Sequence, residues 1–91
     1  MQSRKIYLIE RIHQDKLILI ASTYTIRKAY EISLFEGNIA QPDISYKSLQ
    51  RRLTIGDSVI MYDKSRFVSD TEAKYSPIGD VIRITRTVLI W

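Results

Sequence analysis

The sequence contains no cysteine, a single histidine and only three glycines. Without cysteine there are no disulfide bonds, no thiol nucleophile and no cysteine-ligated zinc site. Zinc would depend on one histidine and scattered carboxylates, and the glycines do not form the loop that cradles phosphates in nucleotide-binding proteins. We therefore predict that the protein holds no metal ion and no cofactor.

Long hydrophobic runs are also missing. The longest nearly apolar run, LILIA at residues 17–21, is far shorter than the roughly 20 residues that a membrane-spanning helix requires. At the N-terminus, MQSRK is followed by only four uncharged residues before Glu10, too few for the apolar core of a secretory signal. These absences predict a cytoplasmic protein that does not enter a membrane.

What the sequence does contain is the composition of an ordinary globular domain, with 45% hydrophobic and 26% charged residues. A chain of 91 residues is large enough for one modest core and too small for two independent ones. We therefore predict a single domain over residues 1–91.

Four segments have the length and composition of strands. The apolar runs KIYLIE (5–10) and KLILIAS (16–22) flank a short polar stretch, which predicts a hairpin. DSVIMYD (57–63) predicts a third strand and DVIRITRTVLIW (80–91) a long fourth one. Alternation in the fourth segment places four apolar side chains on the core-facing side: Ile82, Ile84, Val88 and Ile90.

Between these strand pairs the hydrophobic period changes to that of a helix. Spacings of three and four residues place one apolar set on a single helical face: Ile26, Ala29, Tyr30, Ser33 and Leu34. Thr23 or Thr25 can cap the start of this helix, and Gly37 stands where a left-handed residue is expected to end it.

A second helix is predicted in PDISYKSLQRRL (42–53). Pro42 enforces a break before it, Asp43 or Ser45 can provide its N-cap, and Tyr46, Leu49 and Leu53 form a narrow apolar stripe. The element order strand-strand-helix-helix-strand-strand predicts an α+β fold, in which a small antiparallel sheet is covered on one face by two helices.

The positive charge of the chain is unevenly distributed and lies in its first part. The net charge is +4, and residues 1–53 hold nine Lys/Arg and five Asp/Glu, whereas residues 54–91 hold five of each. No acid occurs between Ile44 and Leu53. Such an uneven positive charge favours a polyanionic partner such as double-stranded DNA.

A helix, a break and a shorter basic helix resemble a helix-turn-helix, in which the second helix enters the major groove. By this resemblance Ser45, Lys47, Ser48 and Arg51 would face base edges, and Arg52 and Lys28 would lie nearer phosphates. Arg4 and Lys5 of the terminal arm would steady the DNA backbone. The connection from Gly37 to Ile44 is longer than the usual tight turn.

KIYLIE, TIRKAYEISL and ISYKSLQRRL together resemble small phage and mobile-element proteins of Gram-positive bacteria, in which a strand hairpin precedes a helix-turn-helix-like pair. The resemblance covers about half of the chain. It implies a small, non-enzymatic DNA-binding regulator.

Two alternatives remain open at this stage. A basic face of this kind is usually only a solvated face, and the helix would then merely cover the sheet. The chain could also be a phage-type inhibitor or adaptor that docks on a host protein, including one that processes nucleic acids.

The apolar strand that ends in VLIW favours pairing with another chain, so a homodimer is also possible.

An enzymatic role has the least support. His13 falls in the predicted hairpin turn, and no nucleophile motif lies beside it. Several acids follow residue 56, and two of them could in principle hold magnesium, although their spacing matches no known motif: Asp57, Asp63, Asp70, Glu72 and Asp80. Of the six tyrosines, Tyr30 and Tyr46 are predicted in the core, and Tyr7 and Tyr62 on an exposed sheet face. We predict no catalytic residues.

Overall fold

The computed structural model describes residues 2–13, 16–55, 58–68, 76–77 and 81–90. The strands of its main sheet are β1 (Ser3–His13), β2 (Lys16–Thr23), β3 (Ser58–Met61) and β6 (Val81–Ile90). The helices are α1 (Ile26–Glu36) and α2 (Tyr46–Ile55). The long connection before β6 contains η1 (Lys64–Arg66), β4 (Phe67–Val68) and β5 (Ser76–Pro77). The predicted α+β class and element order are confirmed, with the small β4–β5 pair as an addition.

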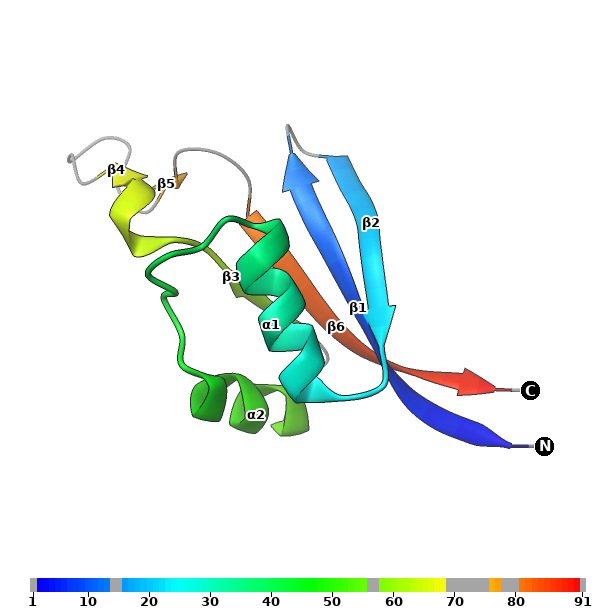
Figure 1. Ribbon diagram of the computed structural model, residues 1–91. Coiled ribbons are helices and arrows are strands. Elements are labelled where there is room, and N and C mark those ends of the chain that lie inside the picture. The colour runs from blue at the N-terminus through cyan, green and yellow to red at the C-terminus, as the bar shows by residue number, and fades with distance from the viewer. Residues whose placement is uncertain (1, 14–15, 56–57, 69–75, 78–80, 91) are drawn as a thin grey trace.

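Four antiparallel strands form the main sheet in the spatial order β2-β1-β6-β3 (Figure 1). The first and last strands of the chain are therefore central neighbours, and they pair from Ser3↔Ile90 to Ile12↔Val81. The predicted hairpin joins β1 to β2, with a register shift after Ile9 where β2 carries an extra residue.

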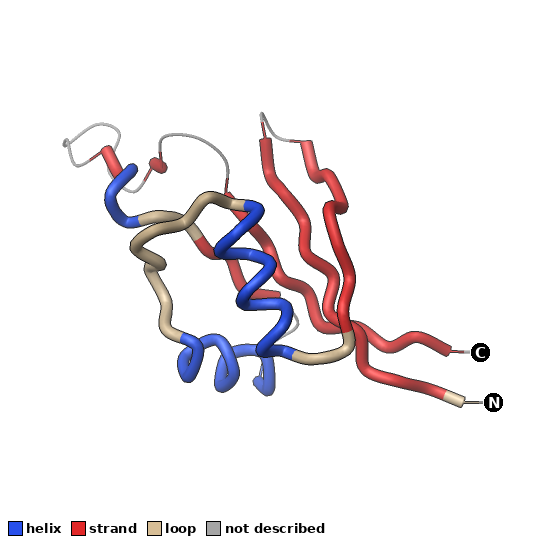
Figure 2. Tube along the Cα trace, in the orientation of Figure 1, coloured by secondary structure: helices blue, strands red, loops and turns tan. Residues whose placement is uncertain are grey.

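Both helices lie on one face of this sheet (Figure 2). α1 contacts β1, β2 and β6, whereas α2 contacts β3 and α1. The helices contribute Ala29, Leu49 and Leu53 to the core, which is otherwise built from sheet and connection residues: Ile9, Ile39, Ile44, Val59, Met61, Ile82 and Ile84. The predicted face of α1 is confirmed, because its five residues are buried or pack against this core.

The two central strands continue past their neighbours as a two-stranded arm. β2 pairs with β1 only from Tyr7 onward, and β3 pairs with β6 only as far as Thr85. The arm accounts for much of the elongated shape, which measures 51 × 27 × 22 Å. Val88 and Ile90 lie in it and are 52% and 59% exposed. The prediction that both face the core is therefore wrong, because the helices do not extend over the arm.

The C-terminus of α1 differs from the prediction. Gly37 has an ordinary helical φ of −85°, and Asn38 is the left-handed residue, with φ of 50°. The Asn38 amide donates to the Phe35 carbonyl and the Ile39 amide to the Leu34 carbonyl, which is the pattern of a Schellman motif. Gly37 is needed for space instead: a Cβ there would lie 2.8 Å from Cγ1 of Ile82.

The connection between the helices is fixed to the end of β3 by two carboxylates. The Asp63 carboxylate accepts hydrogen bonds from the amide of Ala40 at 2.8 Å and from both the amide and the hydroxyl of Ser65. The Asp43 carboxylate accepts from the amide of Tyr62 at 3.0 Å. These contacts explain why the connection can be longer than a tight turn and still hold α2 in place.

The tyrosines divide differently from the prediction. Tyr7 packs against the core on the helical side of the sheet. Side chains alternate along β1, so Tyr7 faces the same side as the buried Ile9, whereas Leu8 and Glu10 face the opposite side. The predicted position of Tyr7 on an exposed sheet face is therefore wrong. Tyr30 packs against the core as predicted, and Tyr46 meets it edge-on, with ring centroids 5.7 Å apart.

Within the described part of the chain, none of the helices has the length and apolar character needed to cross a membrane.

Candidate nucleic-acid interface

The second helix has the two faces that the sequence predicts. Leu49 and Leu53 are buried against the sheet, whereas Lys47 and Arg51 are exposed. The helix begins after Ser45, whose hydroxyl accepts a hydrogen bond from the Ser48 amide at 3.2 Å. The N-cap and the buried leucines therefore hold α2 in place, and its cations point to solvent.

Two of the predicted contact residues take part in this cap. The Ser45 hydroxyl also donates to the Ser48 hydroxyl at 3.2 Å, and Ser48 is half-buried. Both hydroxyls therefore hold the start of the helix, while Lys47 and Arg51 are the more accessible groups on α2.

Arg52 is exposed and lies close to the carboxylate of Asp43. Burial raises the pKa of Asp43, and the positive charges of Arg52 and Lys64 counteract this effect in part. Part of the positive field of Arg52 is therefore offset by Asp43. We expect Arg52 to contribute less to an anionic ligand than Arg51.

The first turn of α1 lies next to α2, and Arg27 makes the contact. The Arg27 guanidinium carbon lies 4.9 Å from the centroid of the Tyr46 ring, within the range of a cation–π interaction. Lys28 is one residue further around the helix and lines a shallow hollow with Glu31 and Phe35. The structure thus brings Arg27, which the sequence analysis overlooked, to the second helix, and places Lys28 on the other flank of α1.

Arg4 connects the arm to the same region. Its guanidinium carbon lies 4.0 Å from the ring centroid of Tyr24, which precedes α1 by two residues, and both side chains are exposed. Lys5, the next residue of the arm, is also exposed. α2, the start of α1 and the arm all lie at the same end of the molecule (Figure 1). We call six exposed cations of these three elements the basic surface and exclude Lys28, which lies on the other flank of α1: Arg4, Lys5, Arg27, Lys47, Arg51 and Arg52.

The helix starts add to the positive potential of this surface. Neither helix has an acid in its first turn, and that turn contains Arg27 and Lys28 in α1 and Lys47 in α2. Cations near a helix N-terminus oppose the helix dipole, at a cost of roughly 0.3–1 kcal/mol each. A bound anion would offset this cost.

The sheet holds each helix by an arginine near its C-terminal end. The Arg86 guanidinium of β6 donates to the Leu53 carbonyl in α2 at 3.0 Å, and the Arg11 guanidinium of β1 donates to the Glu36 carbonyl in α1 at 2.8 Å. No local pattern predicts these two contacts, because each pair is separated by 25 residues or more. Arg86 thereby fixes the position of α2, and with it part of the basic surface.

Of the acids considered for magnesium, only Asp63 falls among the described residues. It is buried, and its hydrogen bonds to Ser65 and Ala40 lower its pKa to about 2. Its oxygens are therefore committed to structure. Across the ranges that the structure describes, no three His, Cys, Asp or Glu side chains gather closely enough to hold a metal ion. His13 is exposed at the end of β1.

Comparisons of the chain with protein-family models, with curated proteins and with solved structures give no significant match.

Proposed function

We propose that the protein binds double-stranded DNA through the basic surface and acts in the cytoplasm as a small, non-enzymatic regulator. The observation that carries the proposal is that three elements far apart in sequence are joined at their exposed ends by two arginine–tyrosine contacts, Arg4 on Tyr24 and Arg27 on Tyr46. A solvated face on α2 alone would not require the arm and the start of α1 to bring further cations beside it.

The dimensions of α2 suit the major groove. A helix with its side chains is about 10–12 Å across and the major groove is about 12 Å wide, so the groove admits α2 along its length of about 15 Å. In this arrangement Lys47 and Arg51 reach toward base edges, because they lie on the exposed face of the helix. Arg27 and Arg52 flank that face and contact phosphates, and the arm extends the phosphate contacts through Arg4 and Lys5.

The second candidate is a phage-type inhibitor or adaptor that binds a host protein. The observation that favours it is Phe35, which is 82% exposed on α1 beside the half-buried Ile32 in the shallow hollow. An aromatic side chain with this exposure is common at the centre of protein interfaces. This candidate predicts a stoichiometric protein complex and little affinity for free DNA.

The decisive experiment is fluorescence anisotropy with a labelled double-stranded DNA of random sequence, at low and at moderate salt. The variant Arg51→Ala/Arg52→Ala removes two cations from the basic surface. Its matched control, Lys16→Glu, lowers the net charge by the same two units at one exposed position, and the start of β2, where Lys16 lies, is at the opposite end of the molecule from α2 (Figure 1).

We expect the wild-type chain to bind with an affinity that falls steeply with salt, because binding releases counterions from the DNA. The Arg51/Arg52 variant should lose most of this binding, and the control should keep most of it. Equal losses in the two variants would mean that net charge alone attracts the DNA, and the basic surface would lose its assignment. Absence of binding at low salt would favour the protein-binding candidate.

A further inference from the structure

The face of the sheet that points away from the helices carries six apolar side chains among the eleven that the strand register places on it. Side chains alternate along each strand, so the neighbours of the buried residues Ile9, Ile82 and Met61 fall on this outer face. Strand register arranges them in rows across the sheet. One row is Leu17, Ile12 and Val81, the next is Leu19, Glu10, Arg83 and Ile60, and the third is Ser22, Leu8, Thr85 and Ser58.

Three apolar side chains on this outer face are about half exposed. Leu17 is 46% exposed, Leu19 59% and Ile60 49%. None of the helices and strands that the structure describes covers the outer face, since α1 and α2 both pack on the other side. An uncovered sheet face that carries half-exposed apolar side chains is a candidate surface for association with another protein.

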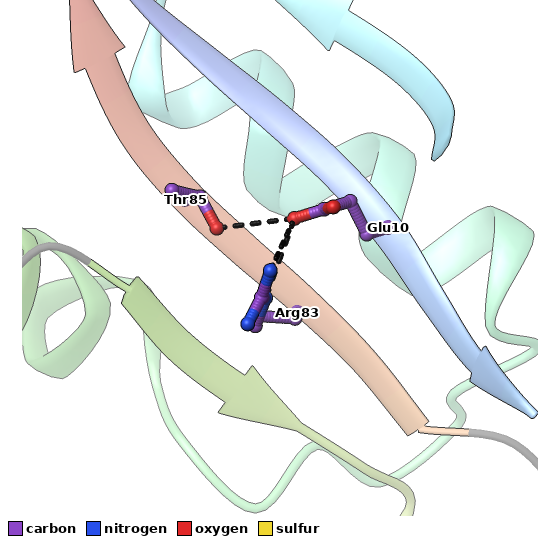
Figure 3. Close-up of polar contacts among 3 residues, drawn as sticks. All are labelled: Glu10, Arg83 and Thr85. Carbon is purple, nitrogen blue, oxygen red and sulfur yellow. Dashed lines mark hydrogen bonds and ion pairs between the residues drawn. The ribbon is translucent and has the colours of Figure 1, made fainter. Parts of the chain in front are cut away.

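A charged pair stands at the centre of this face. Arg83 donates to one carboxylate oxygen of Glu10 at 3.2 Å, and the hydroxyl of Thr85 donates to the same oxygen, also at 3.2 Å (Figure 3). Glu10 and Arg83 are 12% and 35% exposed. Each charge lies beside an apolar side chain of an outer strand, Leu19 next to Glu10 and Ile60 next to Arg83.

We propose that this outer face binds a second copy of the same chain in a two-fold symmetric dimer. A two-fold axis that runs parallel to the strands between β1 and β6 places β1 of one copy over β6 of the other. Glu10 then faces Arg83 of the second copy, and Leu19 faces Ile60 of the second copy. The strand order β2-β1-β6-β3 therefore makes the face complementary to itself in charge and in apolar contact, as an isologous interface requires.

The size of the face fits a small, reversible dimer interface. With about 4.8 Å between strands and about 3.3 Å per residue, eight residues from each of β2, β1 and β6 and the four residues of β3 give a footprint of about 440 Å². Two copies would thus bury about 900 Å², at the small end of specific interfaces. Interfaces at this end of the size range are typically weak and reversible, so self-association is tested over micromolar concentrations.

The test uses sedimentation equilibrium of the full chain from about 1 to about 100 µM. Leu19→Glu and Ile60→Lys each place a charge opposite an apolar side chain, and each alone should weaken self-association at least about 100-fold. Both wild-type residues are about half exposed, so the fold should survive, which far-UV circular dichroism checks. Phe35→Lys is the matched control, because it replaces an exposed apolar residue on α1 and should leave the dimer unchanged.

Mixing the two variants gives the sharpest result. In the mixed dimer the new glutamate of one chain faces the new lysine of the other, so a 1:1 mixture should associate more tightly than either variant alone. A wild-type chain that stays monomeric at about 100 µM, variants that dimerise normally, or a mixture that shows no recovery would each overturn the proposed dimer. The proposed dimer would also be overturned if the chain stayed monomeric and its outer face bound a different protein.

The dimer does not depend on DNA binding. The basic surface and the outer face consist of different residues. The variant Arg51→Ala/Arg52→Ala should therefore remain dimeric, and the variant Leu19→Glu should retain non-specific DNA binding. Failure of one proposal is therefore distinguishable from failure of the other.

Discussion

The guanidinium of Arg86 in β6 donates a 3.0 Å hydrogen bond to the carbonyl oxygen of Leu53, in the C-terminal half of α2. The two residues are 33 positions apart, and the contact is partly buried. It places a positive charge near the negative end of the helix dipole while it satisfies a carbonyl in the last turns of the helix. The central strand of the sheet thereby determines where the basic helix lies.

Replacing Arg86 with leucine should lower the free energy of unfolding by about 1–2 kcal/mol, because a charge-assisted hydrogen bond is lost and the Leu53 carbonyl is left without this donor. Urea unfolding followed by circular dichroism measures the change. Arg51→Leu is the control, since Arg51 is exposed, and it should change the stability by less than about 0.5 kcal/mol. Equal stability of the two variants would contradict the structural role of Arg86.

Asp63 should make the free energy of unfolding decrease as the pH is lowered through the acid range. Its folded-state pKa is about 2, below the ordinary value of 3.8, so the folded chain favours the ionised form. The stabilisation is fully present above about pH 4 and is lost as the pH falls toward 2. The pKa of Asp43 is shifted upward by burial and has the opposite effect, so the comparison must isolate Asp63.

Urea unfolding of the wild type and of Asp63→Asn between about pH 6 and pH 2 provides that comparison. The difference in stability between the two proteins should be largest above about pH 4 and should shrink toward pH 2. A difference that stays constant over the whole range would show that the charge of Asp63 does not stabilise the fold.

Gly37→Ala should destabilise the fold although the backbone of Gly37 suits any residue. The new Cβ would lie 2.8 Å from Cγ1 of the buried Ile82 and 2.9 Å from the Ser33 carbonyl oxygen. Such overpacking costs about 1–3 kcal/mol. Asn38→Gly, at the left-handed position next to it, should change stability by less than about 1 kcal/mol, because glycine adopts positive φ without steric cost. Thermal unfolding of both variants measures which substitution destabilises the fold more. A greater loss of stability in Asn38→Gly than in Gly37→Ala would contradict the steric role of Gly37.

Arg27→Ala should reduce the salt dependence of DNA binding if Arg27 contacts a phosphate. Removing one phosphate contact lowers the slope of log K against log salt by about 0.9. Anisotropy titrations at several salt concentrations measure this slope. Lys28→Ala serves as a neighbouring control with the same charge change. It should affect the slope less, because Lys28 lies on the other flank of α1 beside Glu31. A larger effect from Lys28 would move the interface away from α2.

Local signals in the sequence determined the elements and their types. The change of hydrophobic period between residues 22 and 26, the cap at Thr25 and the break at Pro42 are short-range features, and they place two helices between two pairs of strands. The basic character of residues 47–52 is also explicit in the sequence. These features needed no knowledge of distant contacts, because propensity, capping and periodicity act within a few residues.

Only the tertiary structure decided how the elements meet. The pairing of β1 with β6 produces the arm and exposes Val88, although alternation alone assigned it to the core. The space that Gly37 leaves for Ile82, and the contact of Arg27 with Tyr46, likewise depend on residues that are distant along the chain. The sequence by itself therefore determined which helices and strands exist and where the positive charge is concentrated. The sheet order, the shape of the basic surface and the uncovered outer face were decided by long-range packing, which no local pattern encodes.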